Sequence, residues 1–297
     1  MYEHIKTNSP KAWILAARPK TLTGAAVPVM AGCGLAVADN VFSPIPAALC
    51  LLFAFLMQID ANLINDYFDY IKGSDREDRL GPQRACQEGW ITLSAMKRGI
   101  IATTLLSAIE GSLLLLFGGW ELIIIGALCM LGAFLYTAGP RPLSYEGLGD
   151  LMVIIFFGLI PVETTYYIMS GNMTWYATMA AMATGFATDA LLIINNFRDH
   201  DQDVISGKKT IVVRLGRENG ARLYLITGII AAMLCIPLVL RGQLWAALLP
   251  QLYLWPHFTT WKRMIAINNG RELNSVLGAT ARNILIFGIL LTLGLMM

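Results

Sequence analysis

The chain has 297 residues, of which 56% are hydrophobic and only 14% are charged, and its mean hydropathy is +0.58. An average soluble domain carries about 25% charged residues, so the composition argues against an ordinary soluble enzyme and indicates a polytopic membrane protein. The net charge is only +2, and no nucleic-acid partner is expected. The five cysteines are scattered and form no CxxC pair, which argues against a zinc site or a disulfide framework.

Apolar segments of membrane-spanning length recur along the whole chain. A spanning helix needs about 20 mainly apolar residues. Nine segments approach that length: Leu22–Ala38, Pro46–Ile64, Gly99–Phe117, Leu122–Thr137, Leu151–Ser170, Trp175–Asn195, Ala221–Leu240, Leu244–Trp261 and Asn283–Met297. We therefore predict an all-α membrane protein in which nine transmembrane helices form a single bundle around a central cavity. Residues 1–297 are expected to form one domain.

The basic residues are distributed unevenly between the predicted connections. If the amino terminus is cytoplasmic, every one of the 22 lysines and arginines except Arg241 falls on the cytoplasmic side. Cytoplasmic segments of membrane proteins carry such an excess, so this distribution supports both the number of helices and the cytoplasmic amino terminus. The first ten residues contain no apolar core and no small-residue cleavage site, so no cleaved signal peptide is expected.

Two aspartate-rich stretches follow apolar segments on the predicted cytoplasmic side, at residues 62–84 and 195–214. In the first stretch, polar side chains recur at intervals of three and four residues, which places them on one face of a helix. Its Asn65 and Asp69 recur as Asn195 and Asp199 in the second stretch. This weak internal repeat suggests that the two stretches face one another across the bundle.

The two stretches supply a set of oxygen ligands for a metal ion. A carboxylate at mid-membrane costs roughly 2.5–3.5 kcal/mol, so such groups usually face a polar cavity and act there. Mg²⁺ prefers carboxylate, amide and phosphate oxygens. We predict two Mg²⁺ ions held by the carboxylates and amides of both stretches, with the four aspartates as the catalytic residues: Asp66, Asp69, Asp199, Asp203, Asn65 and Asn196.

Basic side chains beside these ligands suit a diphosphate, because lysine and arginine neutralise phosphate charge. The predicted diphosphate-binding residues are Asn65, Lys72, Arg79, Arg84, Asn196, Arg198, Lys208 and Lys209. A diphosphate clamp on the inner face of an apolar bundle implies a charged head and a long apolar tail, as in a polyprenyl diphosphate. An ion-coupled transporter would also use paired intramembrane carboxylates. The basic loops that follow both stretches suit phosphate better than a permeating cation.

The NDxxD motif at residues 65–69 and the NxxDxxxD motif at residues 196–203 resemble the paired motifs of the UbiA superfamily of intramembrane aromatic prenyltransferases. Further segments are similar to the branch that prenylates 1,4-dihydroxy-2-naphthoate in menaquinone synthesis: Ala17–Leu22, Arg79–Ala85, Tyr136–Gly149 and Gly207–Gly216. The sequence also departs from the superfamily pattern, because Gly73 stands where many members carry a further carboxylate. The first stretch therefore offers only two carboxylates to a metal.

The resemblance implies Mg²⁺-dependent transfer of a prenyl group from polyprenyl diphosphate to the aromatic acceptor, with loss of carbon dioxide, giving demethylmenaquinone. It also implies an integral protein of the bacterial inner membrane whose site faces the cytoplasm. The residues expected to bind the acceptor are Arg18, Lys20, Asn62, Tyr136 and Tyr145. Another acceptor, 4-hydroxybenzoate or a tetrapyrrole, is the alternative within the superfamily. The sequence indicates no general base and no oligomeric state.

Overall fold

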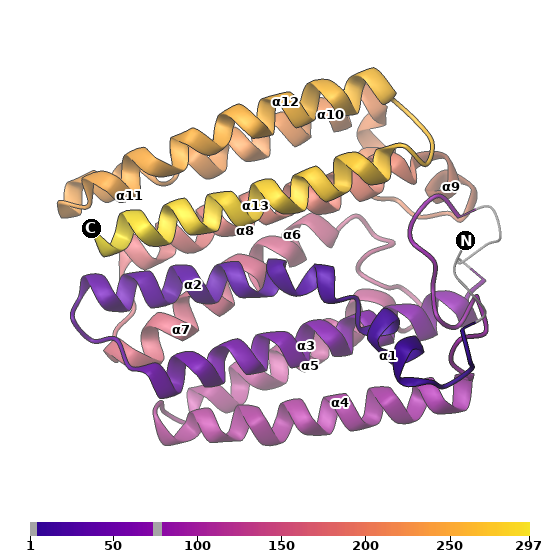
Figure 1. Ribbon diagram of the computed structural model, residues 1–297, viewed down its shortest axis with the longest axis horizontal. Coiled ribbons are helices and arrows are strands. Elements are labelled where there is room, and N and C mark those ends of the chain that lie inside the picture. Colours follow the sequence, from indigo (N-terminus) through magenta and orange to yellow (C-terminus); the bar gives the residue numbers. More distant parts are fainter. Residues whose placement is uncertain (1–4, 74–78) are drawn as a thin grey trace.

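The structure is a computed structural model, and it describes residues 5–73 and 79–297. Within this range the chain is all-α and contains no strand, as predicted. The long helices run side by side along the long axis of the molecule (Figure 1). They are α2 (Leu22–Ala38), α3 (Pro44–Ile71), α4 (Leu93–Leu113), α5 (Glu121–Thr137), α7 (Ile160–Ser170), α8 (Trp175–Arg198), α10 (Ile211–Met233), α12 (Leu254–Ile267) and α13 (Leu273–Met296). Shorter helices are α1 (Pro10–Ala17), α6 (Gly149–Ile154), α9 (His200–Ile205) and α11 (Leu244–Leu248).

Among the described residues, 7 helical segments are long and apolar enough to cross a membrane. They are Pro10–Ala38, Pro44–Ile71, Leu93–Leu116, Gly149–Ser170, Trp175–Arg198, Ile211–Arg241 and Leu273–Met296. Two further predicted spans are less regular. Helix α5 has only 17 residues, and α11 and α12 are separated by a 3₁₀ segment, Leu249–Tyr253, that contains Pro250. Proline lacks the N–H that a regular α-helix needs at that position.

Four helices extend well beyond their predicted apolar segments. Helix α3 continues to Ile71, whereas the prediction ended at Ile64. Helices α4, α10 and α13 begin at Leu93, Ile211 and Leu273, rather than at Gly99, Ala221 and Asn283. These additions contain polar or charged residues among apolar ones, so hydrophobicity alone does not detect them. The extension of α3 places the first aspartate-rich motif, residues 65–69, in a regular α-helix. The side chains of this motif therefore project in directions that the helix fixes.

Helix α8 lies against a distorted neighbour. Between α6 and α7 the chain forms a π-helical segment, Ile155–Leu159, which is followed by Pro161. A Cβ on Gly158 would lie 2.7 Å from the Cα of Gly185 in α8, so only glycine permits this approach. Close contacts through small residues are typical of membrane helices, and π-helical turns often occur at functional sites.

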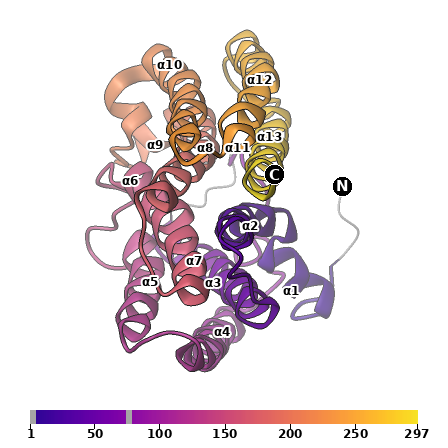
Figure 2. The ribbon, with the colours of Figure 1, turned by 90° about the vertical axis from the view of Figure 1, so that its left-hand side faces the viewer.

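Viewed along the bundle, α2, α3, α4, α5 and α7 form one group, and α10, α12 and α13 form another, with α8 between them (Figure 2). A lone acid joins two helices of the first group: the buried carboxylate of Asp60 in α3 accepts hydrogen bonds from Thr103 and Thr104 in α4. This buried carboxylate therefore joins α3 to α4.

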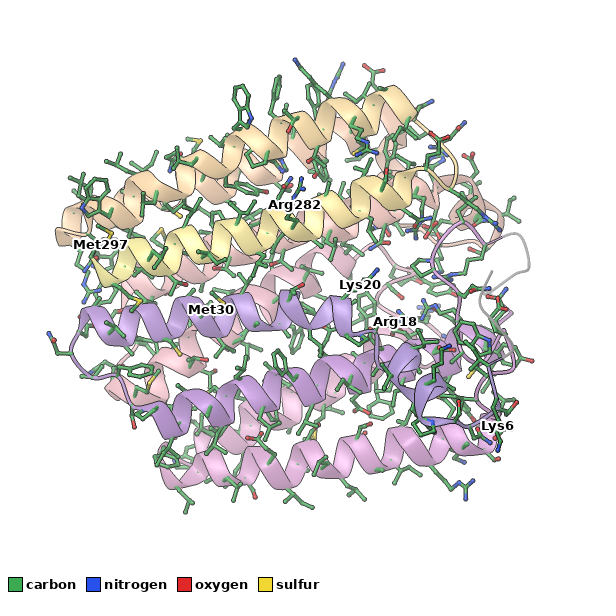
Figure 3. The ribbon with its side chains drawn as sticks, viewed as in Figure 1. Lys6, Arg18, Lys20, Met30, Arg282 and Met297 are labelled. Carbon is green, nitrogen blue, oxygen red and sulfur yellow. The ribbon has the colours of Figure 1, made fainter. Side chains whose placement is uncertain are left out.

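The two ends of the bundle differ in charge. Lys6 and the carboxyl-terminal Met297 lie at opposite ends (Figure 3). Arg241 forms an ion pair with Asp39, which follows α2, and its guanidinium lies 3.6 Å from the ring centre of Tyr176. The Tyr166 and Tyr176 hydroxyls also donate hydrogen bonds to Asp39. Arg241, the one basic residue predicted on the non-cytoplasmic side, is thus neutralised by the neighbouring carboxylate of Asp39.

Candidate active site

Both aspartate-rich stretches lie at the same end of the bundle. The first occupies the last turns of α3, and the second occupies the end of α8 and the short helix α9, near the right-hand edge of Figure 1. Two chain segments far apart in the sequence therefore contribute to one polar region. The loop that follows α3 and the loop that follows α5 lie at the same end of the bundle (Figure 1).

The carboxylate of Asp66 holds the loop that follows α3. Asp66 is only 1% exposed, and its two oxygens accept hydrogen bonds from the backbone N–H groups of Ala85 at 2.8 Å and Cys86 at 3.0 Å. One turn further along α3, Asp69 forms a buried ion pair with Arg84 at 3.3 Å. The two carboxylates of the first motif thus have different partners. The charge of Asp69 also acts on Asp203 in α9, whose pKa it helps to raise.

The second stretch is organised around a buried arginine. Arg198 is 2% exposed, donates two hydrogen bonds to Asp199 at 2.8 and 2.6 Å, and donates a third to Asn274 of α13 at 2.9 Å. Glycine at position 81 is needed beside it, because a Cβ there would lie 2.8 Å from the guanidinium. Arg198 therefore connects α8 with α13, and its donors are directed at protein groups.

Asp203 in α9 lies where charges from both stretches meet. Its nearest basic group is the Lys208 Nζ, at 3.9 Å. Burial is the main cause that raises the pKa of Asp203 to about 7; the nearby carboxylates of Asp199 and Asp69 act in the same direction, whereas Lys208 and Arg198 act against it. The charged form of Asp203 is thus disfavoured by its surroundings, and a cation placed among these three carboxylates would stabilise it.

Two lysines share one aromatic ring beside Asp203. The Nζ atoms of Lys72 and Lys208 lie 5.3 and 4.9 Å from the ring centre of Tyr145, within the range of cation–π attraction. Lys72 also donates a 2.6 Å hydrogen bond to the Thr137 carbonyl. Burial lowers the pKa of Lys72, Asp69 opposes this effect, and the second ammonium of Lys208 adds to it. Tyr145 thus belongs to the predicted diphosphate end of the site.

These residues meet the chemical requirements of a Mg²⁺ site. The ligand atoms that they offer are carboxylate oxygens, which Mg²⁺ prefers. In the part of the chain that the structure describes, no three acidic, histidine or cysteine side chains converge tightly enough to form a complete protein site. Mg²⁺ usually binds one or two carboxylates and takes its remaining ligands from water and substrate phosphate, so this arrangement fits that ion.

Other predicted ligands have mainly structural contacts. The Asn65 side chain accepts a hydrogen bond from Thr137, and the Arg79 Nε donates to the Pro82 carbonyl at 3.2 Å. Lys209 is exposed, and its backbone N–H donates to the Tyr145 carbonyl at 2.8 Å. Asn196 is half-buried on the last turn of α8. None of these contacts directs the side chain toward Asp203.

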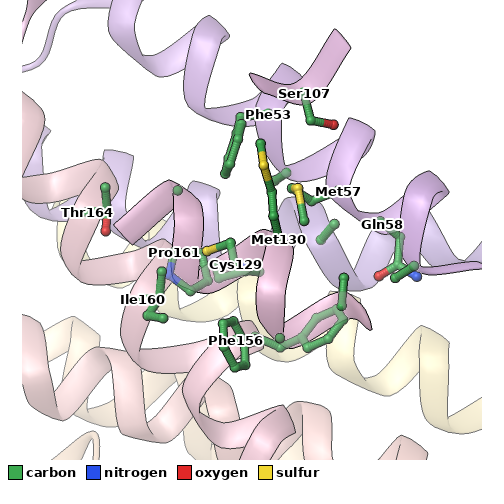
Figure 4. A pocket seen from close by; sticks show the side chains of 18 of the residues that line it. Phe53, Met57, Gln58, Ser107, Cys129, Met130, Phe156, Ile160, Pro161 and Thr164 are labelled. Carbon is green, nitrogen blue, oxygen red and sulfur yellow. The ribbon is translucent and has the colours of Figure 1, made fainter. Parts of the chain in front are cut away.

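A deep apolar cavity adjoins the polar end of the bundle. It has a volume of about 620 Å³ and lies among α2, α3, α4, α5, the α6–α7 segment and α8. Phe53, Met57, Met130 and Phe156 surround it, while Gln58 supplies polar atoms (Figure 4). Volumes of this size are typical of small-molecule sites. Among the residues that the sequence singled out, Arg18, Asn62, Asn65 and Tyr136 line this cavity. The rest of the wall was not identified from the sequence, because most of its members are ordinary apolar residues.

The predicted acceptor residues divide into two groups around this cavity. Arg18, Asn62 and Tyr136 line it. The Asn62 amide also donates to the Ala17 carbonyl at 3.0 Å and the Thr21 hydroxyl at 2.9 Å, which fixes the start of α2 against α3. Lys20 is exposed, and neither it nor Tyr145 is among the described residues that form the wall.

Several known proteins with similar sequences carry the same name. A model of the UbiA prenyltransferase family matches residues 25–294. The chain is 40% identical over 234 residues to the 1,4-dihydroxy-2-naphthoate octaprenyltransferase of Escherichia coli, covering 77% of this chain and 76% of the relative. It is 37% identical over 212 residues to the protein of that name from Mycobacterium tuberculosis, covering 71% of this chain and 72% of the relative.

Solved structures share the fold. A UbiA homologue from Archaeoglobus fulgidus, described as bound to GPP and Mg²⁺, superposes with a TM-score of 0.69 at 15% identity, over 94% of this chain and 99% of that one. Its complex with DMAPP and Mg²⁺ gives a TM-score of 0.67. The identity is too low to carry more than the fold. Since the family model extends over most of the sequence, the chain belongs to the UbiA prenyltransferase family.

Proposed function

We propose that this protein transfers a polyprenyl group from polyprenyl diphosphate to 1,4-dihydroxy-2-naphthoate, releasing diphosphate and carbon dioxide and forming a prenylated 1,4-naphthalenediol, the quinol that yields demethylmenaquinone on oxidation. The observation that carries the proposal is an apolar cavity whose wall includes Asn65 and Asn195, each about one helical turn before Asp69 and Asp199 of the polar end. The shared name of the bacterial relatives supports the naphthoate acceptor. Membership of a prenyltransferase family argues against an ion-coupled transporter.

The polar end would hold the diphosphate. Asp69 and Asp203 are the residues that we assign to Mg²⁺, with Asp199 beside them, while Lys72 and Lys208 neutralise phosphate oxygens that the metal does not reach. When bound, Mg²⁺ draws negative charge onto the diphosphate and so makes it a better leaving group. We assign Asp66 and Arg198 to holding these ligands in place, because their own polar atoms bond to the loop after α3 and to α13.

The remaining chemistry takes place at the start of the cavity. The carbon–oxygen bond of the donor breaks, and its electron pair leaves with the diphosphate. The carboxyl-bearing ring carbon of the acceptor supplies the pair for the new carbon–carbon bond. Carbon dioxide then leaves, and its bonding pair restores the aromatic ring. No proton is consumed or released overall. The reaction therefore needs no general base, and the sequence indicates none.

Side chains of the cavity wall would protect this reaction. Phe156 and Tyr136 line the cavity near the polar end and would exclude water and stabilise an allylic cation through their ring faces. Arg18 is our candidate for binding the acceptor carboxylate, because it lines the same region and offers a bidentate fork. We also propose that two Mg²⁺ ions act together, which is the number predicted from the sequence.

We also propose that the whole chain is one domain with nine transmembrane helices, a cytoplasmic amino terminus and a site that faces the cytoplasm, in a bacterial inner membrane. The distribution of basic residues supports this orientation, since only Arg241 falls on the far side. The broken segment α11–α12 and the short α5 would complete the nine spans. Other acceptors, 4-hydroxybenzoate or a tetrapyrrole, are the alternatives within the superfamily.

A direct assay tests the function. The purified protein in detergent is incubated with Mg²⁺, farnesyl diphosphate and either 1,4-dihydroxy-2-naphthoate or 4-hydroxybenzoate, and products are identified by mass spectrometry. We expect a prenylated, decarboxylated naphthalenediol and no product from hydroxybenzoate. Product from hydroxybenzoate alone would overturn the acceptor assignment, and a folded protein without product from either acceptor would overturn the enzyme assignment.

A further inference from the structure

The start of α13 joins the two aspartate-rich stretches through one side chain. It lies at the same end of the bundle as α9 (Figure 1). Asn274, the second residue of α13, accepts a 2.9 Å hydrogen bond at Oδ1 from the buried guanidinium of Arg198 in the second stretch. Its Nδ2 donates a 2.8 Å hydrogen bond to the carbonyl of Leu80, in the loop part of the first stretch. A single amide thus connects both stretches, although α13 belongs to neither.

The amide of Asn274 suits this position because it presents a donor and an acceptor together. Its Nδ2 also donates to the carbonyl of Arg271 at 2.9 Å, so the oxygen and the NH₂ group are both bonded. Turning the amide over would place its oxygen against two carbonyls and its N–H groups against the guanidinium of Arg198. The contacts therefore allow one orientation, and neither a carboxylate nor a hydrocarbon side chain could form all three.

Neighbouring contacts hold the loop of the first stretch close to α13 and to Arg198. The Nη2 of Arg271 donates to the carbonyl of Arg79 at 3.3 Å, one residue before Leu80. A Cβ on Gly81, one residue after Leu80, would lie 2.8 Å from the Nη2 of Arg198. The loop therefore approaches the guanidinium on one side of Leu80 and bonds to the start of α13 on the other.

The connection between α12 and α13 is held by the second stretch as well. Arg217 of α10 donates from Nη1 to the carbonyl of Asn268, which follows α12, at 2.7 Å. The Nη2 of the same guanidinium donates to Asp201 in α9 at 2.9 Å. Residues 268–274 are therefore tied to the second stretch at two points, Asn268 through Arg217 and Asn274 directly.

The contacts of Asn274 lead on to carboxylates of the proposed metal site. Arg198 donates two hydrogen bonds to Asp199. On the other side, Arg84 lies in the same loop as Leu80 and forms the ion pair with Asp69. Groups bonded to the carboxylates around a metal ion orient those carboxylates. The placement of Asp69 relative to Asp199 thus depends on the link that Asn274 makes between Leu80 and Arg198.

We propose that Asn274 is a positioning residue that sets the separation of the two aspartate-rich stretches, and thereby the affinity of their site for Mg²⁺ and diphosphate. This inference rests on the proposed function. Asn274 is not part of the described cavity wall, and it acts through Arg198 and the Leu80 carbonyl rather than by contact with the substrate. Helix α13, which carries none of the proposed metal ligands, therefore contributes to the site.

Two substitutions separate the contacts of Asn274. Asn274→Asp keeps an acceptor for Arg198 but has no N–H to donate to Leu80, whereas Asn274→Leu removes both contacts in a side chain of similar shape. Turnover of geranyl diphosphate and 1,4-dihydroxy-2-naphthoate is measured over a range of Mg²⁺ concentrations. We expect the Mg²⁺ concentration for half-maximal turnover to rise about tenfold or more in both variants, as when other groups that orient metal ligands are lost. The KM of the acceptor should stay unchanged.

Two controls separate this effect from charge and from stability. The negative charge added in Asn274→Asp attracts Mg²⁺, so by itself it would lower the Mg²⁺ requirement rather than raise it. Asn283→Leu is the matched control on the same helix, because it removes hydrogen bonds to the Pro256 carbonyl at 3.1 Å and the Thr260 hydroxyl at 2.8 Å. It should lower the temperature of thermal unfolding in detergent and leave the Mg²⁺ requirement unchanged.

A wild-type Mg²⁺ requirement in Asn274→Asp would overturn the proposal, because the link to Leu80 would then have no role at the site. So would an Asn274→Leu variant that is less stable but needs no more Mg²⁺, or one whose acceptor KM rises equally. Asn274→Asp retains a partner for the buried Arg198, and it decides the test if Asn274→Leu does not fold. A folded wild-type protein without turnover would instead contradict the proposed function, so the two failures are distinguishable.

Discussion

The two aspartate-rich stretches look alike in sequence but use their carboxylates in a different order. By sequence spacing, Asp69 corresponds to Asp199. By contacts, Asp69 resembles Asp203, because both face the region shared by the two stretches. Asp66 and Asp199 instead bond to structural partners, the loop after α3 and Arg198. Although Asp69 also pairs with Arg84, we propose that each stretch uses one carboxylate to hold the scaffold and one at the site, a division that the weak repeat alone does not reveal.

The largest expected effect comes from removing a carboxylate of the site. Asp69→Ala and Asp203→Ala should each lower turnover by about 100-fold or more, as when other charge-stabilising groups of an active site are lost. Turnover is measured by mass spectrometry of the product at saturating Mg²⁺. Size-exclusion chromatography in detergent should show that both variants remain folded. Near-normal turnover in either variant would remove that residue from the metal site.

The scaffold carboxylate should be separable from the site carboxylate by stability. Asp66→Ala removes the acceptor of two buried N–H groups, and each unpaired group costs about 1–3 kcal/mol. Thermal unfolding in detergent should therefore occur at a lower temperature than in the wild type, together with loss of turnover. Tyr70→Ala, whose side chain is 40% exposed on the same helix, is the control. If Asp66→Ala unfolds like the wild type, its hydrogen bonds to the loop contribute nothing and only a ligand role is left.

A smaller effect is expected at Tyr145, whose ring contacts one lysine from each aspartate-rich stretch. Tyr145→Leu removes the cation–π attraction that holds Lys72 and Lys208, and about 1 kcal/mol would raise the KM for the prenyl diphosphate about fivefold. The KM for the acceptor should stay unchanged, because Tyr145 does not line the described cavity wall. Tyr145→Phe keeps the ring and should behave like the wild type. A rise in the acceptor KM alone would restore the acceptor role predicted from the sequence.

The smallest effect is expected at the opposite end of the bundle. Arg241→Met removes an ion pair with Asp39 and a contact with Tyr176, together worth about 1 kcal/mol. Thermal stability should fall slightly while both KM values stay the same. A change in either KM would show that the far end of the bundle is coupled to the site.

The sequence predicted what depends on local pattern. Helix α2 begins at Leu22 and ends at Ala38 as expected, because an apolar run ends there at Asp39. The polar end of α3 was also anticipated from its three- and four-residue spacing. In contrast, the hydrogen bonds that Arg198 donates to Asp199 and Asn274 were not anticipated from the sequence. Such roles depend on contacts with segments distant in the sequence, which no local pattern encodes.

Tyr145 illustrates the same limit. Its ring lies beside Lys72 and Lys208, and the backbone N–H of Lys209 donates a hydrogen bond to the Tyr145 carbonyl. These contacts join segments that several helices separate in the sequence. The residue was therefore visible in the sequence, but its partners were not.

The central claim is that Asp69 and Asp203, from opposite stretches, jointly bind Mg²⁺ and the diphosphate. It is tested most directly by calorimetric titration of a non-reactive geranyl thiodiphosphate into the wild type, Asp69→Asn and Asp203→Asn, with and without Mg²⁺. The account predicts Mg²⁺-dependent binding in the wild type and its loss in both variants. Equal binding by all three proteins, or wild-type binding that does not require Mg²⁺, would contradict it.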